Sequence, residues 1–178
     1  MRGDPDRREG SEQASGGATS DEPASTTSAR QRDAGGTYTL LIDLPATTTV
    51  TVGALGTHRL SAGAYAYTGS ALGPGGFARV TRHRRTARDD HDVRHWHIDS
   101  LLGDTPATID RVYYASGADV ECSVADRLPA GPVDGFGASD CGCVSHLAGP
   151  EPADVLRERA RRAYDAEAST VDVSTDGR

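Results

Sequence analysis

Beyond residue 35, the hydrophobic and polar positions first follow the pattern of short β-strands. Residues 36–44, "GTYTLLIDL", begin with alternation and then run apolar, which suits a strand buried on at least one face. Two short β-rich pieces flank a glycine-containing turn and predict a hairpin at 48–60. Residues 64–70, "AYAYTGS", predict a further strand. The pattern therefore predicts four strands before the first helix.

Helical periodicity begins after the turn "GPGG". We expect helices at 77–88 and 93–103, followed by a strand at 107–116 that is rich in β-branched and aromatic residues. Apolar positions four residues apart predict an amphipathic helix at 119–128. Residues 132–147 are glycine-rich and irregular. This order of elements predicts an α/β fold of the α+β sandwich type, with a small, mostly antiparallel mixed sheet flanked by helices.

Composition divides the chain into a central domain and two ends. Residues 1–35 contain almost nothing apolar and predict a disordered leader. We expect the domain at 36–149, which contains the tryptophan, both phenylalanines and every cysteine and histidine. Residues 150–178 predict a short helix with a thin apolar face, docked loosely, and then a frayed acidic tail.

The expected location of the chain follows from the same composition. No stretch approaches the roughly 18 consecutive apolar residues that a membrane span needs. The start, "MRGDPDRREG", lacks the apolar core of a secretory signal. We therefore expect a cytoplasmic protein with no membrane partner.

The chain is acidic and contains no lysine. Its 19 basic residues are all arginine, whereas 26 positions are Asp or Glu, which gives a net charge of −7. This composition fits a GC-rich genome and a high-salt cytoplasm, in which acidic surfaces keep proteins hydrated and apart. Mutational bias alone explains the missing lysines equally well.

Arginines nevertheless gather in the predicted helix at 77–88. Five of them surround His83, with no acidic residue before Asp89: Arg79, Arg82, Arg84, Arg85 and Arg88. Residues two apart on a helix face opposite sides, so these arginines must surround much of the helix. Two interpretations follow: a solvated helix whose arginines pair with acids elsewhere, or a surface that binds a phosphate polyanion such as nucleic acid.

Histidines flank the tryptophan in the segment "HWH". On a helix the imidazoles of His95 and His97 would lie about 200° apart, so they would not readily chelate one metal ion. Trp96 then belongs to the core or offers a surface to an unstacked base. We retain His97 as a candidate site residue and place His95 outside the site.

A loop near the end of the predicted domain combines thiols, an imidazole and a carboxylate. Cys141, Cys143 and His146 could join Cys122 or another histidine around zinc, with Asp140 beside them. The spacing C-x-C-x-x-H is tighter than in the usual structural zinc sites, and it leaves the fourth ligand open. Reduced thiols beside a turn are the favoured interpretation, and a zinc site is the alternative.

Two triplets on predicted strands resemble the paired signatures of the GIY-YIG nuclease superfamily: "GTY" at 36–38 and "YTG" at 67–69. That family has an arginine on the first helix after the second triplet, often with a histidine one turn later, and Arg79 and His83 match this pattern. It also has a glutamate on a later helix, which matches Glu121. With "HWHID" and "GFGASDCGCVSHL", the chain is similar to a stand-alone archaeal, haloarchaeal-type branch of these domains.

The resemblance implies a metal-dependent endonuclease that hydrolyses phosphodiester bonds in DNA during repair or recombination, with RNA as an alternative substrate. Tyr38 and Tyr67 would orient or deprotonate the attacking water, and Arg79 would hold the phosphate. His83 or His97 would share the proton transfer.

The resemblance also assigns roles to the remaining candidates. Glu121 would hold one Mg²⁺ or Mn²⁺ ion that keeps most of its waters. The other arginines of the predicted 77–88 helix would position phosphates: Arg82, Arg84, Arg85 and Arg88.

The chain departs from the family pattern at three points. Thr37 and Thr68 replace the middle isoleucines of the two triplets. The two signature tyrosines are 29 residues apart, which fits an inserted hairpin at 48–60. The chain contains no asparagine, so the late asparagine of the family would have to be replaced by Asp140 or Ser139.

Two further hypotheses follow from these departures. The same fold without catalysis would be a nucleic-acid-binding or protein-interaction module, stabilised by zinc in one version. A third hypothesis is a regulatory thiol domain that uses Cys141 and Cys143, which would require a redox-dependent change in activity or oligomeric state.

Overall fold

A five-stranded antiparallel sheet forms the centre of the protein. The computed structural model describes residues 35–91 and 93–175, so the predicted disordered leader lies outside the described residues apart from Gly35. Across the sheet, the strands are β6 (Leu147–Glu151), β4 (Gly63–Ser70), β1 (Gly36–Leu44), β5 (Thr108–Ser116) and β7 (Asp172–Thr175). A separate hairpin consists of β2 (Thr48–Thr51), the short 3-10 helix η1 (Gly53–Leu55) and β3 (Thr57–Leu60). The predicted mixed α/β class with a mostly antiparallel sheet is confirmed.

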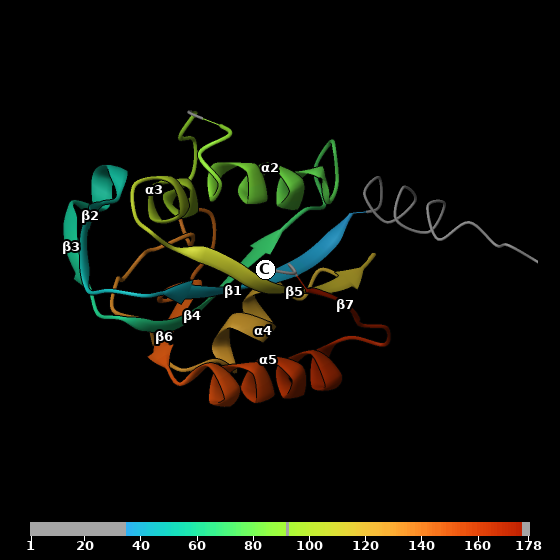
Figure 1. Cartoon of the computed structure of the whole chain (residues 1–178). Coiled ribbons are helices and arrows are strands. Elements are labelled where there is room, and N and C mark those ends of the chain that lie inside the picture. Colours follow the sequence, from blue (N-terminus) through green and yellow to red (C-terminus); the bar gives the residue numbers. More distant parts are fainter. Residues whose placement is uncertain (1–34, 92, 176–178) are drawn as a thin grey trace, which may run out of the picture.

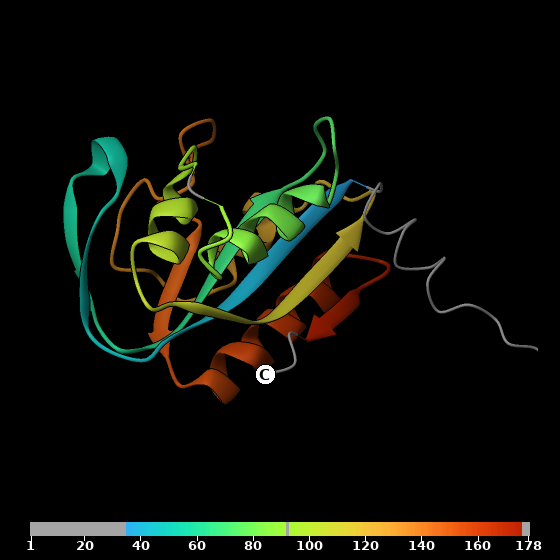
Figure 2. The same ribbon diagram turned by 45° about the horizontal axis from the view of Figure 1, so that its top comes forward.

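Helices cover both faces of the sheet. Helices α2 (Ala78–Thr86) and α3 (His97–Gly103) lie on one face, and α4 (Glu121–Asp126) and α5 (Ala153–Glu167) lie on the other (Figure 1). The view in Figure 2 shows the same sandwich, with the β2–β3 hairpin extending beyond one end of the sheet. No helix among the described residues is long and apolar enough to cross a membrane.

The central strand β1 is buried on both faces. Tyr38, Leu40 and Ile42 belong to the core beneath α2 and α3, whereas Leu41 belongs to the core beneath α5. A central strand covered on both sides needs apolar residues at successive positions. Burial on both faces therefore explains the apolar run in residues 36–44.

The threonines in the two signature triplets have structural partners on the α4–α5 face. Thr37 Oγ1 donates to the carbonyl of Ala118 and accepts the backbone N–H of Val120, both at 3.0 Å. Thr68 Oγ1 lies 2.9 Å from Thr39 Oγ1 and forms a hydrogen bond with it. A hydroxyl is therefore useful at both positions where the family pattern has isoleucine.

Helix α5 docks closely, which corrects the expectation of a loosely docked helix. Its inward side chains are fully or nearly fully buried: Leu156, Ala160, Ala163 and Tyr164. Two of the four are alanines, so the apolar face is thin in sequence but lets the helix approach the sheet closely. Tyr164 adds a buried hydroxyl contact of 3.0 Å with Thr39, and Arg157 pairs with Asp110 on β5 at 2.9 Å.

The sheet also includes two strands from the region that we expected to be irregular or frayed. β6 continues through residues 149 and 150, where we placed the end of the domain, and pairs with β4. β7 pairs with β5 from Arg111 to Tyr114. Three helices are shorter than predicted: α2 ends at Thr86, α3 begins at His97, and α4 spans only Glu121–Asp126.

Replacing Leu156 with alanine tests the docking of α5. Leu156 is fully buried, so Leu156→Ala should lower the free energy of unfolding by about 2–5 kcal/mol in chemical denaturation. The matched control on the same helix is Arg162→Ala, whose side chain is 74% exposed and should change stability by less than about 0.5 kcal/mol. Equal effects of the two substitutions would show that α5 is not part of the core.

Candidate functional site

A cleft of about 370 Å³ lies where the end of β4 meets α2, the start of α3, α4 and the loop that precedes β6. Its lining residues come from separate parts of the chain: Tyr67, Ser70, Gly73, Arg79, His95, Trp96, His97, Glu121, Gly137, Ser139 and Asp140. Five of the predicted site residues therefore share one cavity: Tyr67, Arg79, His97, Glu121 and Asp140.

The two signature tyrosines lie on paired strands. In the register of β1 with β4, Tyr38 is opposite Gly69 and Leu40 is opposite Tyr67. The two tyrosine rings are 6.3 Å apart. Tyr67 reaches the cleft, whereas Tyr38 is 1% exposed and lies behind the cleft wall.

Gly69 allows this packing because the Tyr38 hydroxyl lies directly over it. A Cβ atom at position 69 would lie 2.6 Å from the Tyr38 hydroxyl oxygen, closer than real side chains approach. The glycine of the second triplet is thus required by the ring of the first triplet.

Behind the tyrosines, a hydrogen-bonded chain links Tyr38, His83 and Asp99. Tyr38 Oη lies 2.9 Å from His83 Nε2, and His83 Nδ1 lies 3.0 Å from Asp99 Oδ1. A carboxylate only accepts hydrogen bonds, so Nδ1–H donates to Asp99 and the free Nε2 accepts the Tyr38 hydroxyl. This assigns the tautomer of the neutral imidazole.

The shifted pKa values of His83 and Asp99 keep the imidazole neutral and the carboxylate ionised. Burial lowers the pKa of His83, although Asp99 opposes the shift. Burial acts to raise the pKa of Asp99, but the hydrogen bond and charge of His83, with smaller effects from the backbone and Arg82, lower it overall.

Asp99 also fixes the backbone of the "HWH" segment, a role that we did not predict. Its Oδ2 accepts the backbone N–H groups of His95 and Trp96, each at 3.1 Å. An acidic residue at the third position of a helix typically accepts such bonds, so the segment "HWHID" could have predicted that Asp99 caps the start of a helix. The same carboxylate therefore orients His83 and part of the cleft wall.

Both tyrosines are held as neutral phenols. Burial raises the pKa of Tyr38, and burial also raises the pKa of Tyr67, to which the charge of Glu121 adds while Arg79 acts in the opposite direction. At neutral pH, Tyr67 therefore presents an intact hydroxyl to the cleft, one that can donate and accept hydrogen bonds.

Arg79 is the one residue of the arginine cluster that lines the cleft. Its Nη1 donates to the carbonyl of Ser70 at 2.8 Å, and its guanidinium carbon lies 4.8 Å from the centre of the Trp96 ring. These two contacts hold the side chain in place and leave other N–H groups for a ligand.

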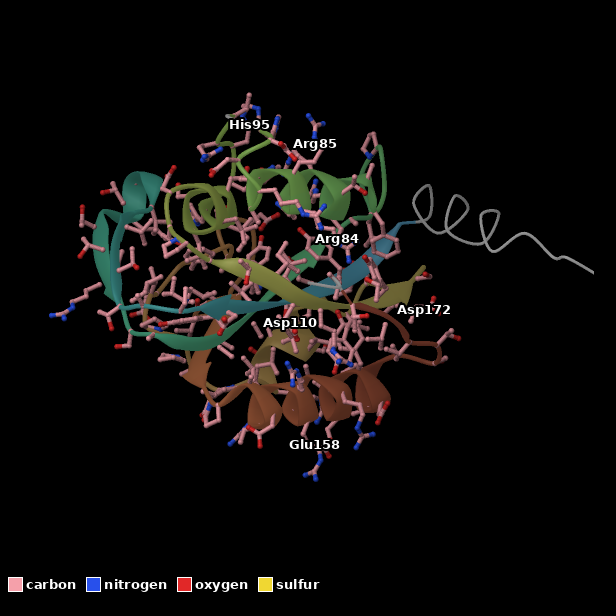
Figure 3. The ribbon with its side chains drawn as sticks, viewed as in Figure 1. Arg84, Arg85, His95, Asp110, Glu158 and Asp172 are labelled. Atoms are coloured by element: carbon pink, nitrogen blue, oxygen red, sulfur yellow. The ribbon has the colours of Figure 1, made fainter. Side chains whose placement is uncertain are left out.

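The other arginines of the cluster point elsewhere. Arg82 lies 3.8 Å from Asp99, and Arg84 donates to Ser174 on β7 at 2.8 Å. Arg85 donates to a backbone carbonyl at 3.2 Å, and Arg88 lies on the exposed turn after α2. Figure 3 shows Arg84 between α2 and the sheet, and Arg85 on the outer side of α2. The structure therefore does not gather these four side chains around the cleft.

The two histidines beside Trp96 both line the cleft, including His95, which we placed outside the site. The backbone N–H of Gly137 donates to His97 Nδ1 at 3.0 Å. In the neutral ring, the proton is then on Nε2, so His97 is a hydrogen-bond donor at that atom. His83, by contrast, is 1% exposed and acts from behind Tyr38.

Glu121 is the first residue of α4 and is partly exposed in the cleft. Its Oε1 accepts a hydrogen bond from His146 Nδ1 at 3.0 Å. Ser139 and Asp140, the two substitutes that we considered for the missing asparagine, line the same cleft. Glu121 and Asp140 thus supply oxygen ligands of the kind that Mg²⁺ and Mn²⁺ prefer.

The thiols predicted at the end of the domain lie beside Glu121 and are not among the cleft-lining residues. Cys141, Cys143 and His146 form a cluster with Cys122, which follows Glu121 on α4. From sequence, Cys122 and a histidine were both candidates for the fourth zinc ligand, and no sequence feature favoured either.

Substituting Gly69 tests the contact beneath Tyr38. Gly69→Ala should lower the free energy of unfolding by about 1–3 kcal/mol, because the new methyl group overlaps the Tyr38 hydroxyl. Gly73→Ala is the matched control, since a Cβ at position 73 meets no atom within 4 Å. The packing argument fails if chemical denaturation gives the two variants the same stability.

Acid titration tests the state of His83. The pKa of His83 is lower in the folded chain than its ordinary value of 6.5, so below that pH the unfolded chain binds a proton that the folded chain does not. The stability advantage of the wild type over His83→Gln should therefore shrink as the pH falls below 6.5. Unfolding curves measured above pH 3.8, the ordinary pKa of Asp99, isolate this effect; parallel pH profiles would contradict it.

Comparisons with known proteins agree with this geometry at the level of the family. A family model described as a domain of unknown function, DUF123, matches residues 37–168, which include every residue of the cleft and all of α5. Comparison with curated proteins and with solved structures found no significant match. Because the family model covers most of the chain, this protein belongs to the DUF123 family, a GIY-YIG-like family.

Proposed function

We propose that the protein is a metal-dependent endonuclease that hydrolyses phosphodiester bonds in DNA, with a structure-specific role in repair or recombination. One observation carries the proposal: a single cleft contains a fixed arginine, a neutral tyrosine hydroxyl and a glutamate on a helix. We further infer membership of a stand-alone archaeal branch, which the lysine-free, acidic composition supports.

Arg79 is suited to hold the phosphate that is attacked. Its guanidinium remains charged and presents several N–H donors in a fixed plane, and its two protein contacts reduce the freedom lost on binding. His97 can add a donor at Nε2. Trp96 is 45% exposed, so its ring can also stack on an unpaired base beside the reacting phosphate.

Tyr67 is suited to orient the attacking water. Its neutral hydroxyl can accept one hydrogen bond from the water while it donates another. We assign Tyr38 a positioning role, because it is buried and acts through the ring packing that Tyr67 shares with it and His83. The hydrogen bonds from Tyr38 to His83 and from His83 to Asp99 hold this cluster of rings in place.

The residues present fit a divalent cation. Glu121 has one carboxylate oxygen fixed by His146, and Asp140 lies in the same cleft, so two hard oxygen donors are available. A bound Mg²⁺ or Mn²⁺ would supply positive charge for the oxygens that become more negative in the transition state.

Hydrolysis also requires a base for the proton of the water. The new bond joins the water oxygen to phosphorus, and the proton of the water passes to a group in the cleft. The bond to one ester oxygen breaks with its electron pair on that oxygen, which leaves and takes a proton from solvent. His95 and Asp140 are lining groups able to accept it. We propose that Asp140 accepts this proton on one carboxylate oxygen, since it shares the cleft with Glu121, while its other oxygen stays available to the cation.

A second candidate function has its own support. Tyr38 is sealed from the cleft, and the chain contains no asparagine. In a domain of this fold that binds nucleic acid without cutting it, Arg79 and Trp96 would still contact the nucleic acid, and only phosphodiester cleavage would be absent.

Cleavage assays distinguish the two functions. Labelled duplex, flap, splayed-arm and four-way-junction DNA, and a matching RNA duplex, would be incubated in high KCl with Mg²⁺ or Mn²⁺. Arg79→Ala and Glu121→Ala should each reduce the cleavage rate by about 10²–10⁴-fold, because each removes charge stabilisation from the transition state. Arg79→Lys should retain part of the activity, since it keeps the charge without the planar fork.

Arg162→Ala is the control, because Arg162 is exposed on α5, a helix that contributes no residue to the cleft lining. It should cut at the wild-type rate. Binding of a branched DNA without any metal-dependent cleavage would replace the nuclease with the non-catalytic module, and equal cleavage by wild type and Glu121→Ala would refute the assigned site.

A further inference from the structure

Three thiols and one imidazole converge behind Glu121. One ligand atom each from Cys122, Cys141, Cys143 and His146 lies within 4.8 Å of all the others. His146 Nε2 lies 3.4 Å from Cys141 Sγ and 3.9 Å from Cys122 Sγ. The imidazole is 2% exposed, so this convergence is an interior feature rather than a chance meeting of surface side chains.

We propose that Cys122, Cys141, Cys143 and His146 bind a structural Zn²⁺ ion. Tetrahedral zinc with three sulfur ligands and one nitrogen ligand places its ligand atoms about 3.5–3.8 Å apart. The observed separations bracket this range before any metal has drawn the ligands together. Three cysteines and one histidine form a known closed ligand set for structural zinc.

The hydrogen bond between His146 and Glu121 is independent support. Glu121 Oε1 can only accept, so His146 Nδ1 carries the proton and the lone pair of the ring is on Nε2. That lone pair faces the sulfur atoms. A zinc-bound histidine ordinarily donates its other N–H to a carboxylate, and this arrangement has the same form.

Zinc would also explain how an irregular segment is held in place. Residues 127–146 contain neither helix nor strand. Val133, Phe136 and Ala138 are buried, but no residue at 139–145 is, so the last part of the segment needs another source of order. Three of the four ligands come from its last part and the fourth from α4. The ion would therefore fasten this segment to α4.

The same segment carries Gly137, Ser139 and Asp140 to the cleft, and the zinc ligand His146 holds Glu121. On the proposed nuclease function, the zinc site would thus orient the glutamate that binds the catalytic cation and support the adjacent cleft wall. Glu121 would therefore serve two metal sites. It would bind the catalytic cation directly and would affect the zinc ion only through its hydrogen bond with His146.

Metal analysis of the full, untagged chain tests the site. Protein produced in zinc-supplemented medium, and purified under reducing conditions without chelator, should contain about one zinc ion per chain by mass spectrometry. Cys143→Ser and His146→Gln should each reduce zinc to background. His58→Gln is the matched control, since His58 lies on the β2–β3 hairpin and should leave the zinc content unchanged.

A cobalt-exchanged wild type keeps the proposal testable if the cysteine variants do not fold. Bound Co²⁺ should give sulfur-to-cobalt charge-transfer absorption, because the proposed ligands include three thiolates. Background zinc in the wild type with no cobalt–sulfur absorption would overturn the site. Formation of a disulfide instead of metal binding, detected by thiol titration, would favour a regulatory thiol domain.

The link to Glu121 has a separate test. Glu121→Gln should weaken zinc binding by about 10–100-fold in competition with a coloured chelator, because the carboxylate orients the ligand His146. Asp126→Asn, at the exposed end of the same helix, should bind zinc like the wild type. Equal affinities would refute the link.

None of these three measurements uses nucleic acid. A chain that binds zinc but does not cut DNA refutes only the nuclease, and a chain that cuts DNA without zinc refutes only the zinc site.

Discussion

The hydrogen-bond register between β1 and β4 is the constraint on which the cleft depends. It places Tyr38 opposite Gly69, where the ring has just enough space. A slip of either strand by one residue would turn its tyrosine toward α5, because side chains alternate between the faces. The other face opposes such a slip, since the hydroxyls of Thr39, Thr68 and Tyr164 are bonded together there. The sheet thus fixes the site from both sides.

The distribution of charge explains how an acidic protein uses a cluster of arginines. The cluster is not a uniform patch: Arg82 faces Asp99, Arg84 connects α2 to β7, and Arg79 lines the cleft. Much of the positive charge therefore stabilises the fold. On the proposed function, a nucleic acid would contact one fixed guanidinium and an exposed tryptophan. High salt weakens the binding energy of such short-range contacts less than that of a diffuse charged patch.

The sequence was sufficient for features set by local pattern and insufficient for those set by distant contacts. Strand periodicity predicted the strands β1 to β5. The resemblance to the GIY-YIG pattern singled out Arg79, which lines the cleft. Asp99 was missed as a site residue because only the fold brings His83 to it. Its bonds to the backbone N–H groups of residues 95 and 96 are local and follow the usual pattern of a helix start. The docking of α5 was underestimated because alanines look weakly apolar in a pattern, yet they permit close packing against a sheet.

Glu121 shows why site residues cannot be assigned one at a time. From sequence, the resemblance to the family gives this residue one expected role, to hold a divalent cation. In the structure, one of its oxygens is committed to His146, which in turn faces three thiols. A carboxylate that is fixed in this way loses less entropy when it binds a cation, but it also offers fewer free lone pairs, so a second oxygen donor becomes more important. Asp140 lies in the same cleft and directly precedes Cys141 of the thiol cluster. The order of the segment around Asp140 and the charge available to the cleft are therefore linked through the same few residues.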